Sequence, residues 1–154
     1  MSDREVLEAA VPVIENQWCQ GAWIGRMLPT EVKPMNNRVD QVISGAHPDE
    51  IQRWEAEGVD LRYCAMGALQ MVMGCHVMPT LDQIVHDPEA YRQLDRIAKK
   101  LVKVADEQHP DWWTDVDREW LYGAGAISAV EAFNDNHTRD VMLAIFEKTI
   151  ANME

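Results

Sequence analysis

Hydrophobic residues recur every three or four positions in several parts of the chain, as they do on the buried face of an α-helix. The clearest stripe runs from Tyr91 to Ala105 and has charged residues on its opposite side. Asp87 and Pro88 precede it, and these residue types are favoured at the N-cap and at the first position of a helix. The pattern therefore predicts a long amphipathic helix that begins near Pro88.

Helices are also expected towards both ends of the chain. Residues 3–18 carry a similar stripe, in which Pro12 should kink or split the helix because proline has no amide hydrogen. Thr138 is a suitable cap for a last helix over Arg139–Ala151. A further helix is expected over residues 114–133, interrupted by two glycines.

The most apolar segment is Tyr63–His76, which holds two of the three cysteines, three of the nine methionines and two of the eight glycines. It has no acidic or basic residue apart from His76, so it predicts a helix over residues 61–77 that is buried on all sides. Each glycine destabilises such a helix by about 1 kcal/mol relative to alanine. A helix that contains glycines despite this cost usually packs closely against another backbone. We expect this central helix to contact the glycines of the 114–133 helix.

Prolines and glycines interrupt every periodic pattern in residues 25–60. Within this segment, residues 39–43 fit either one helical turn or a short strand, and residues 47–54 predict a short helix. Another short helix is expected over residues 79–85. The pattern as a whole predicts an all-α fold, with residues 1–154 forming a single domain. We expect a compact bundle of five to six helices with a long irregular segment at about 25–60.

Charge and cysteine content narrow the function classes. With 26 acidic and 14 basic residues among 154, the formal net charge is -12, which argues against direct binding to nucleic acid. The three cysteines show no disulfide framework and fit a reducing compartment. The chain has neither an apolar run long enough for a membrane span nor the basic start of a secretory signal. We therefore expect a soluble, cytoplasmic protein without a cofactor.

Three short motifs occur in a fixed order along the chain: Trp18–Ala22, Cys64–Leu69 and Phe133–Asp135, followed by a helical end. In order and spacing they resemble a small uncharacterised family of actinobacteria and their bacteriophages. The resemblance spans most of the chain, although the middle segment is longer here and Trp112-Trp113 is an addition. It implies a shared fold and a phage origin, and no activity.

A cysteine hydrolase is one hypothesis for the function. Cys64 begins the predicted central helix, where the helix dipole favours a thiolate. His137 would act as the base, with Asp135, Asn134 or Asp140 to orient it. Against this, burial in so apolar a segment raises a thiol pKa. The polar residues around His137 are explained by an expected turn of cap-type residues over 134–138, before the last helix.

A metal site is a weaker hypothesis, because no cysteine or histidine pair has the spacing of a zinc module. The available ligands are Cys64, Cys75, His76, His86, His109 and His137. We expect no bound metal.

A binding module is the preferred hypothesis. Trp112 and Trp113 are adjacent, so we expect that they are not both buried, and tryptophan is over-represented at interaction hot spots. Asp111 and Asp115 flank them, which favours a basic or amphipathic partner. We therefore expect a non-enzymatic protein that binds a protein partner or a small ligand, such as a phage-encoded modulator or inhibitor of a host or defence protein. A homo-oligomer is also plausible, because spare aromatic side chains often close a twofold interface.

Overall fold

The protein combines helices with a small sheet, so the expected all-α fold is wrong. The computed structural model describes residues 1–28, 37–77, 84 and 87–153. The helices are α1 (Asp3–Gln17), α2 (Pro48–Ala56), α3 (Ala65–Val72), α5 (Pro88–Gln108), α6 (Arg118–Leu121), α7 (Ala126–Asn136) and α8 (Arg139–Ala151), with a 3-10 helix η1 (Pro110–Trp113). The strands are β1 (Ile24–Met27), β2 (Gln41–Ile43) and β3 (Asp60–Tyr63).

The three strands form an antiparallel sheet in the order β2-β1-β3. Ile24 of β1 lies opposite Ile43 on one side and Tyr63 on the other. Each strand has only three or four residues, which is too short to show a period of two in the sequence. For residues 39–43, the strand alternative is confirmed, since Val42 and Ile43 belong to β2.

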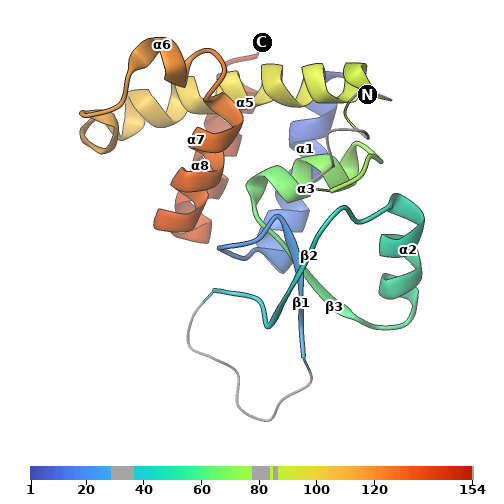
Figure 1. Ribbon diagram of the computed structural model, residues 1–154. Coiled ribbons are helices and arrows are strands. Elements are labelled where there is room, and N and C mark those ends of the chain that lie inside the picture. The colour runs from blue at the N-terminus through green and yellow to red at the C-terminus, as the bar shows by residue number, and fades with distance from the viewer. Residues whose placement is uncertain (29–36, 78–83, 85–86, 154) are drawn as a thin grey trace.

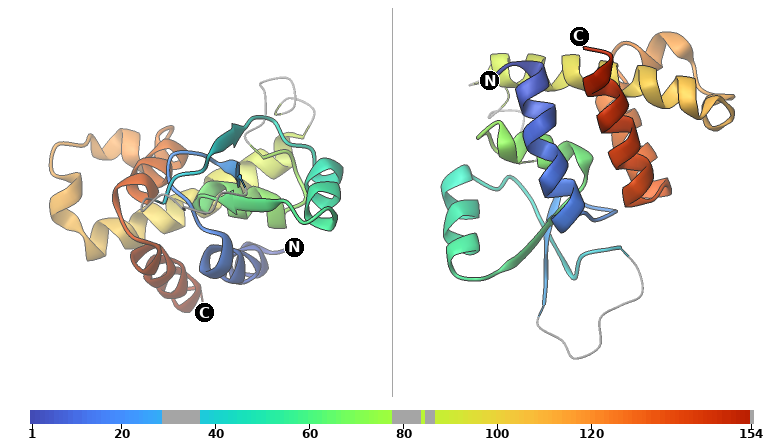
Figure 2. Two further views of the ribbon diagram at one scale, coloured as in Figure 1. Left: turned by 90° about the horizontal axis from the view of Figure 1, so that it is seen from below. Right: turned by 180° about the vertical axis from the view of Figure 1, so that it is seen from behind.

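The helices gather above the sheet (Figure 1). α5 lies across one end of the helical part and packs against α1, α7 and α8. α1 and α8 run side by side, as Figure 2 shows from behind. α3 occupies the centre, in contact with α1, α7 and β3, and α2 lies to one side of the sheet.

The central helix is shorter than the expected 61–77. Its first residues belong to β3, and the helix spans Ala65–Val72 and ends before Gly74, whose φ of 71° is a left-handed conformation. All side chains from Ala65 to Gln70 are buried. Gly67 is needed because a Cβ at this position would overlap the carbonyl oxygen of Trp23. The backbone before β1 therefore packs directly on α3.

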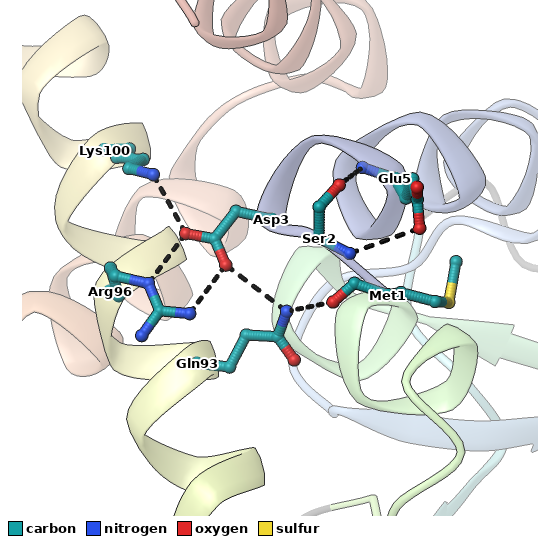
Figure 3. Close-up of polar contacts among 7 residues, drawn as sticks. All are labelled: Met1, Ser2, Asp3, Glu5, Gln93, Arg96 and Lys100. Carbon is teal, nitrogen blue, oxygen red and sulfur yellow. Dashed lines mark hydrogen bonds and ion pairs between the residues drawn. The ribbon is translucent and has the colours of Figure 1, made fainter.

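α1 is continuous from Asp3 to Gln17, so Pro12 does not split it. Its N-terminus carries a capping box: the Ser2 hydroxyl accepts from the Glu5 amide and the Glu5 carboxylate accepts from the Ser2 amide. The carboxylate of Asp3 accepts hydrogen bonds from Arg96, Lys100 and Gln93 of α5 (Figure 3). This cluster joins the start of the chain to its longest helix.

The helix expected over residues 114–133 is two helices. α6 is one short turn capped by Asp117, and α7 begins after Gly125. The indole of Trp120 covers Gly125 so closely that a Cβ there would overlap it. The expected contact of glycine against glycine is therefore wrong, because Gly67 meets Trp23 and Gly125 meets Trp120.

The remaining expectations mostly agree with the structure. The helices expected to begin near Pro88 and at Arg139 are α5 and α8, capped by Asp87 and Thr138, and the one expected at 47–54 is α2. The short helix expected at 79–85 lies outside the described residues, apart from Ile84. In the part of the chain that the structure describes, no helix is long and apolar enough to cross a membrane.

Candidate functional site

Asn134 is a fully buried side chain near the end of α7. Its amide oxygen accepts from the indole nitrogen of Trp18 at 2.8 Å and from the backbone nitrogen of Ala65 at 3.0 Å. Its amide nitrogen donates to the carbonyl oxygen of Cys19 at 3.1 Å. Both groups at the oxygen can only donate, so they set the orientation of the amide. One side chain thus joins α7 to the end of α1 and to the start of α3.

Asp135 and Gln20 extend this connection. Asp135 Oδ1 accepts from the backbone nitrogen of Gly21 at 2.8 Å, and Gly21 has a φ of 80°. The side chain of Gln20 donates to the carbonyl oxygens of Asn134 and His137. The contacts hold the turn after α1 against the end of α7, which gives Asp135 a structural role. Asn134, Asp135 and Asn136 lie inside α7, so the expected turn at these residues is wrong.

Cys64 is the N-cap of α3, and its sulfur accepts from the backbone nitrogen of Gly67 at 3.4 Å. The side chain is buried, and this burial raises the pKa of the thiol well above its ordinary value, despite the hydrogen bond from Gly67. Burial also raises the pKa of the neighbouring Cys19 thiol to about 12. Both thiols are therefore protonated at neutral pH, the opposite of what a nucleophile needs.

The residues of the hydrolase hypothesis have other partners. His137 Nδ1 lies 2.8 Å from the carbonyl oxygen of Phe133, and its ring stacks on the Phe133 ring with centroids 3.7 Å apart. Burial lowers the pKa of His137. Within the described residues, no hydrogen bond joins His137 to Cys64 or to Asp135. The hypothesis stays a prediction that these contacts do not favour.

A second cluster of side chains is aromatic and surrounds Phe133. The ring of Trp113 is buried and stacks on Phe133 with an interplanar angle of 7°. Trp112 contacts Trp113, Phe133 and His137 edge-on and is 37% exposed. Of the two adjacent tryptophans, one is therefore core and the other remains partly open to solvent.

The chain around Trp112 also exposes acidic and aromatic side chains, and we call residues 111–122 the acidic tryptophan segment. Figure 1 shows it as η1 and α6 at the end of α5 that lies away from α2. Its exposed acids are Asp111, Asp115, Asp117 and Glu119. Its one basic residue, Arg118, forms an ion pair with Asp106 of α5. Trp120 and Tyr122 are 45% and 39% exposed.

The chain matches a family of unknown function, DUF6197, over residues 1–152. The protein belongs to this family. No curated protein and no solved structure matches it.

In this DUF6197 protein the three motifs read from the sequence meet at one place. The buried amide belongs to Asn134 of the third motif. It forms hydrogen bonds with Trp18 and Cys19 of the first motif and with Ala65 of the second. From the sequence, Asn134 was expected to belong to a turn, so its role as a buried hydrogen-bonding group was missed. The available signal was its position, four residues after Val130 and seven after Ile127, which puts Asn134 on the apolar face of a helix.

The structure does not bring the candidate metal ligands together. Among the described residues, no three side chains of histidine, cysteine, aspartate or glutamate could hold one ion. His86 lies outside those residues. Cys75 is partly buried, and burial raises its thiol pKa to about 11.

Proposed function

We propose that this protein is a non-enzymatic binding protein that docks a basic protein partner on the acidic tryptophan segment. One observation supports this most. Six large hydrophobic side chains are exposed in the described part of the chain, and three of them, Trp112, Trp120 and Tyr122, lie in residues 111–122. Exposed aromatic residues concentrated in one segment are typical of interaction surfaces.

The negative charge of the segment indicates what kind of partner it would bind. The segment has four exposed acids, and Arg118, its one base, is already paired with Asp106. A partner would therefore supply lysine or arginine side chains around an apolar group that covers Trp112. Attraction between the charges would raise the association rate and make binding sensitive to salt.

Packing against buried neighbours holds the exposed aromatic side chains of the segment in place. Trp112 rests edge-on against the buried Trp113 and against Phe133, and Trp120 lies over Gly125. Aromatic side chains that are already held in place lose little conformational freedom on binding. If the chain has the phage origin that its motifs imply, the partner would be a host or defence protein that it modulates or inhibits.

The test starts with affinity capture from a host lysate, followed by titration of each purified captured protein. A supporting result is a basic partner whose affinity falls at least about tenfold with Trp112→Ala plus Trp120→Ala, the loss of one hot-spot contact. Asp111→Asn plus Asp115→Asn should weaken binding mainly at low salt.

Matched control variants distinguish binding through residues 111–122 from a general effect of removing an aromatic ring or a charge. Tyr91→Ala removes an equally exposed aromatic ring from α5, and Glu57→Gln plus Glu147→Gln removes two exposed charges elsewhere. Circular dichroism should show that every variant is folded. A partner that binds the tryptophan variant as tightly as the wild type would overturn the proposal.

A further inference from the structure

A polar cavity of about 390 Å³ lies where the end of α1 meets the start of α8. Its lining residues are Glu15, Asn16, Trp18, Asn37, Arg62, Thr138, Arg139 and Asp140. None of them belongs to the acidic tryptophan segment, so this cavity is a separate candidate site. A volume of a few hundred cubic ångströms is in the range of small-ligand pockets.

Hydrogen bonds hold three side chains in the wall of this cavity. Trp18 is 7% exposed and is held by its hydrogen bond to Asn134. A guanidinium nitrogen of Arg139 donates to the carbonyl oxygen of Glu15 at 3.2 Å, which links the first residue of α8 to α1. Arg62 is held by two hydrogen bonds to Asp60, of 2.8 and 3.1 Å. The cavity is thus formed before any ligand arrives.

The charges in the wall balance, although the chain as a whole carries a net charge of -12. Arg62 and Arg139 are positive, and Glu15 and Asp140 are negative. Arg139 forms an ion pair with Asp140 at 3.4 Å, and Arg62 is paired with Asp60. Among the described residues, no hydrogen bond or ion pair occupies the carboxylate of Glu15. The two helix ends add opposite partial charges, negative at the end of α1 and positive at the start of α8. A ligand with a single sign of charge would therefore meet repulsion from half of the wall.

A second cavity, of about 190 Å³, shares Trp18, Asn37 and Arg62 with the first. It continues towards the sheet and adds Cys19, Met27, Arg38 and Asp60 to the lining. The additional space would accept the polar backbone of a ligand whose charged groups lie in the first cavity.

We propose that this pair of cavities binds a small zwitterion of the short-peptide class. The ligand carboxylate would lie between the outer guanidinium nitrogens of Arg62 and Arg139, and its ammonium group at the carboxylate of Glu15. Guanidinium and carboxylate groups form strong charge-assisted hydrogen bonds, which would orient the peptide in one direction. The proposal is independent of the function proposed for residues 111–122.

The probe is tri-alanine, compared with N-acetyl-tri-alanine and with tri-alanine amide. The readout is the indole N–H signal of Trp18 in a nitrogen–proton correlation spectrum, which responds to a ligand on this wall. We expect tri-alanine to shift this signal with saturation, and each blocked peptide to bind at least about tenfold more weakly, the loss of one charge-assisted hydrogen bond.

Two variants test which residues bind the carboxylate and the ammonium group of the peptide. Arg139→Gln should lower the affinity for tri-alanine about tenfold, to the affinity that the wild type has for tri-alanine amide. Glu15→Gln should lower it to the affinity that the wild type has for N-acetyl-tri-alanine. Arg92→Gln on α5 is the control, because it removes an exposed arginine away from the cavity. Equal binding of all three peptides, no shift at Trp18, or an equal loss with Arg92→Gln would each overturn the proposal.

Discussion

The indole nitrogen of Trp18 donates a hydrogen bond of 2.8 Å to the side-chain oxygen of Asn134, 116 residues further along the chain. Both residues are buried, so neither group can exchange this partner for water. The bond fixes the end of α1 against α7 and also holds the wall of the cavity beside α8. A single amide therefore connects the core to a candidate binding surface.

Replacing Asn134 with alanine should lower the free energy of unfolding by about 3 kcal/mol, because the buried N–H groups of Trp18 and Ala65 lose their acceptor. Urea denaturation followed by circular dichroism measures the change. Asn136→Ala is the matched control on the same helix, where the exposed side chain should contribute at most about 0.5 kcal/mol. A loss for Asn134→Ala no larger than the control's would contradict the role of this amide.

Gly67→Ala should destabilise the protein by about 2 kcal/mol or more, although alanine is favoured over glycine by about 1 kcal/mol inside a helix. The reason is that a Cβ at residue 67 overlaps the carbonyl oxygen of Trp23, so α3 and the chain before β1 must separate. Ser128→Ala at an exposed position of α7 serves as the comparison and should be neutral or slightly stabilising. Thermal unfolding that shows Gly67→Ala to be as stable as the wild type would rule out this close packing.

Asp3 should stabilise the protein in a pH-dependent way. Hydrogen bonds from Arg96 and Lys100 hold the pKa of this carboxyl well below its ordinary value of 3.8. A carboxyl with a depressed pKa in the folded state stabilises at pH values above its ordinary pKa, and this contribution is lost as the pH falls through the folded pKa.

Asp3→Asn should therefore cost about 1 kcal/mol near neutral pH, a value kept small because Arg96 is half exposed to solvent. The difference from the wild type should shrink below about pH 4. Stability measured by urea denaturation across this range gives the comparison, with Asp115→Asn as an exposed control. A constant difference at every pH would show that the cluster acts without the charge of Asp3.

Thiol reactivity should separate the three cysteines. In the native protein at about pH 8, Cys75 should react first, because its pKa is raised least and its side chain is only partly buried. Cys19 and Cys64 should react only when the protein unfolds. Cys75→Ser should therefore remove the reactivity of the folded state. Rapid reaction of Cys64 in a Cys19→Ser, Cys75→Ser protein would instead favour the hydrolase hypothesis.

Local patterns were sufficient for the parts of the fold that depend on neighbouring residues. The stripe from Tyr91 to Ala105 and the cap at Asp87 predicted α5, and Thr138 marked the start of α8. These signals are local because a helix forms its hydrogen bonds within four residues and its caps within three. Their adjacency alone also predicted that Trp112 and Trp113 are not both buried, and only Trp113 is.

The tertiary structure decided what depends on distant partners. β1 pairs with β2 and β3 from elsewhere in the chain, and strands of three or four residues leave no periodic signal, so the sheet was missed. Asn134 was interpreted as a turn residue because its hydrogen bonds reach Trp18, Cys19 and Ala65. The sequence alone determined the positions of α1, α2, α5 and α8 and which side chains are apolar. Only the packing of those segments determined that Asn134 is the point at which they meet, because a buried hydrogen bond requires both of its partners in place.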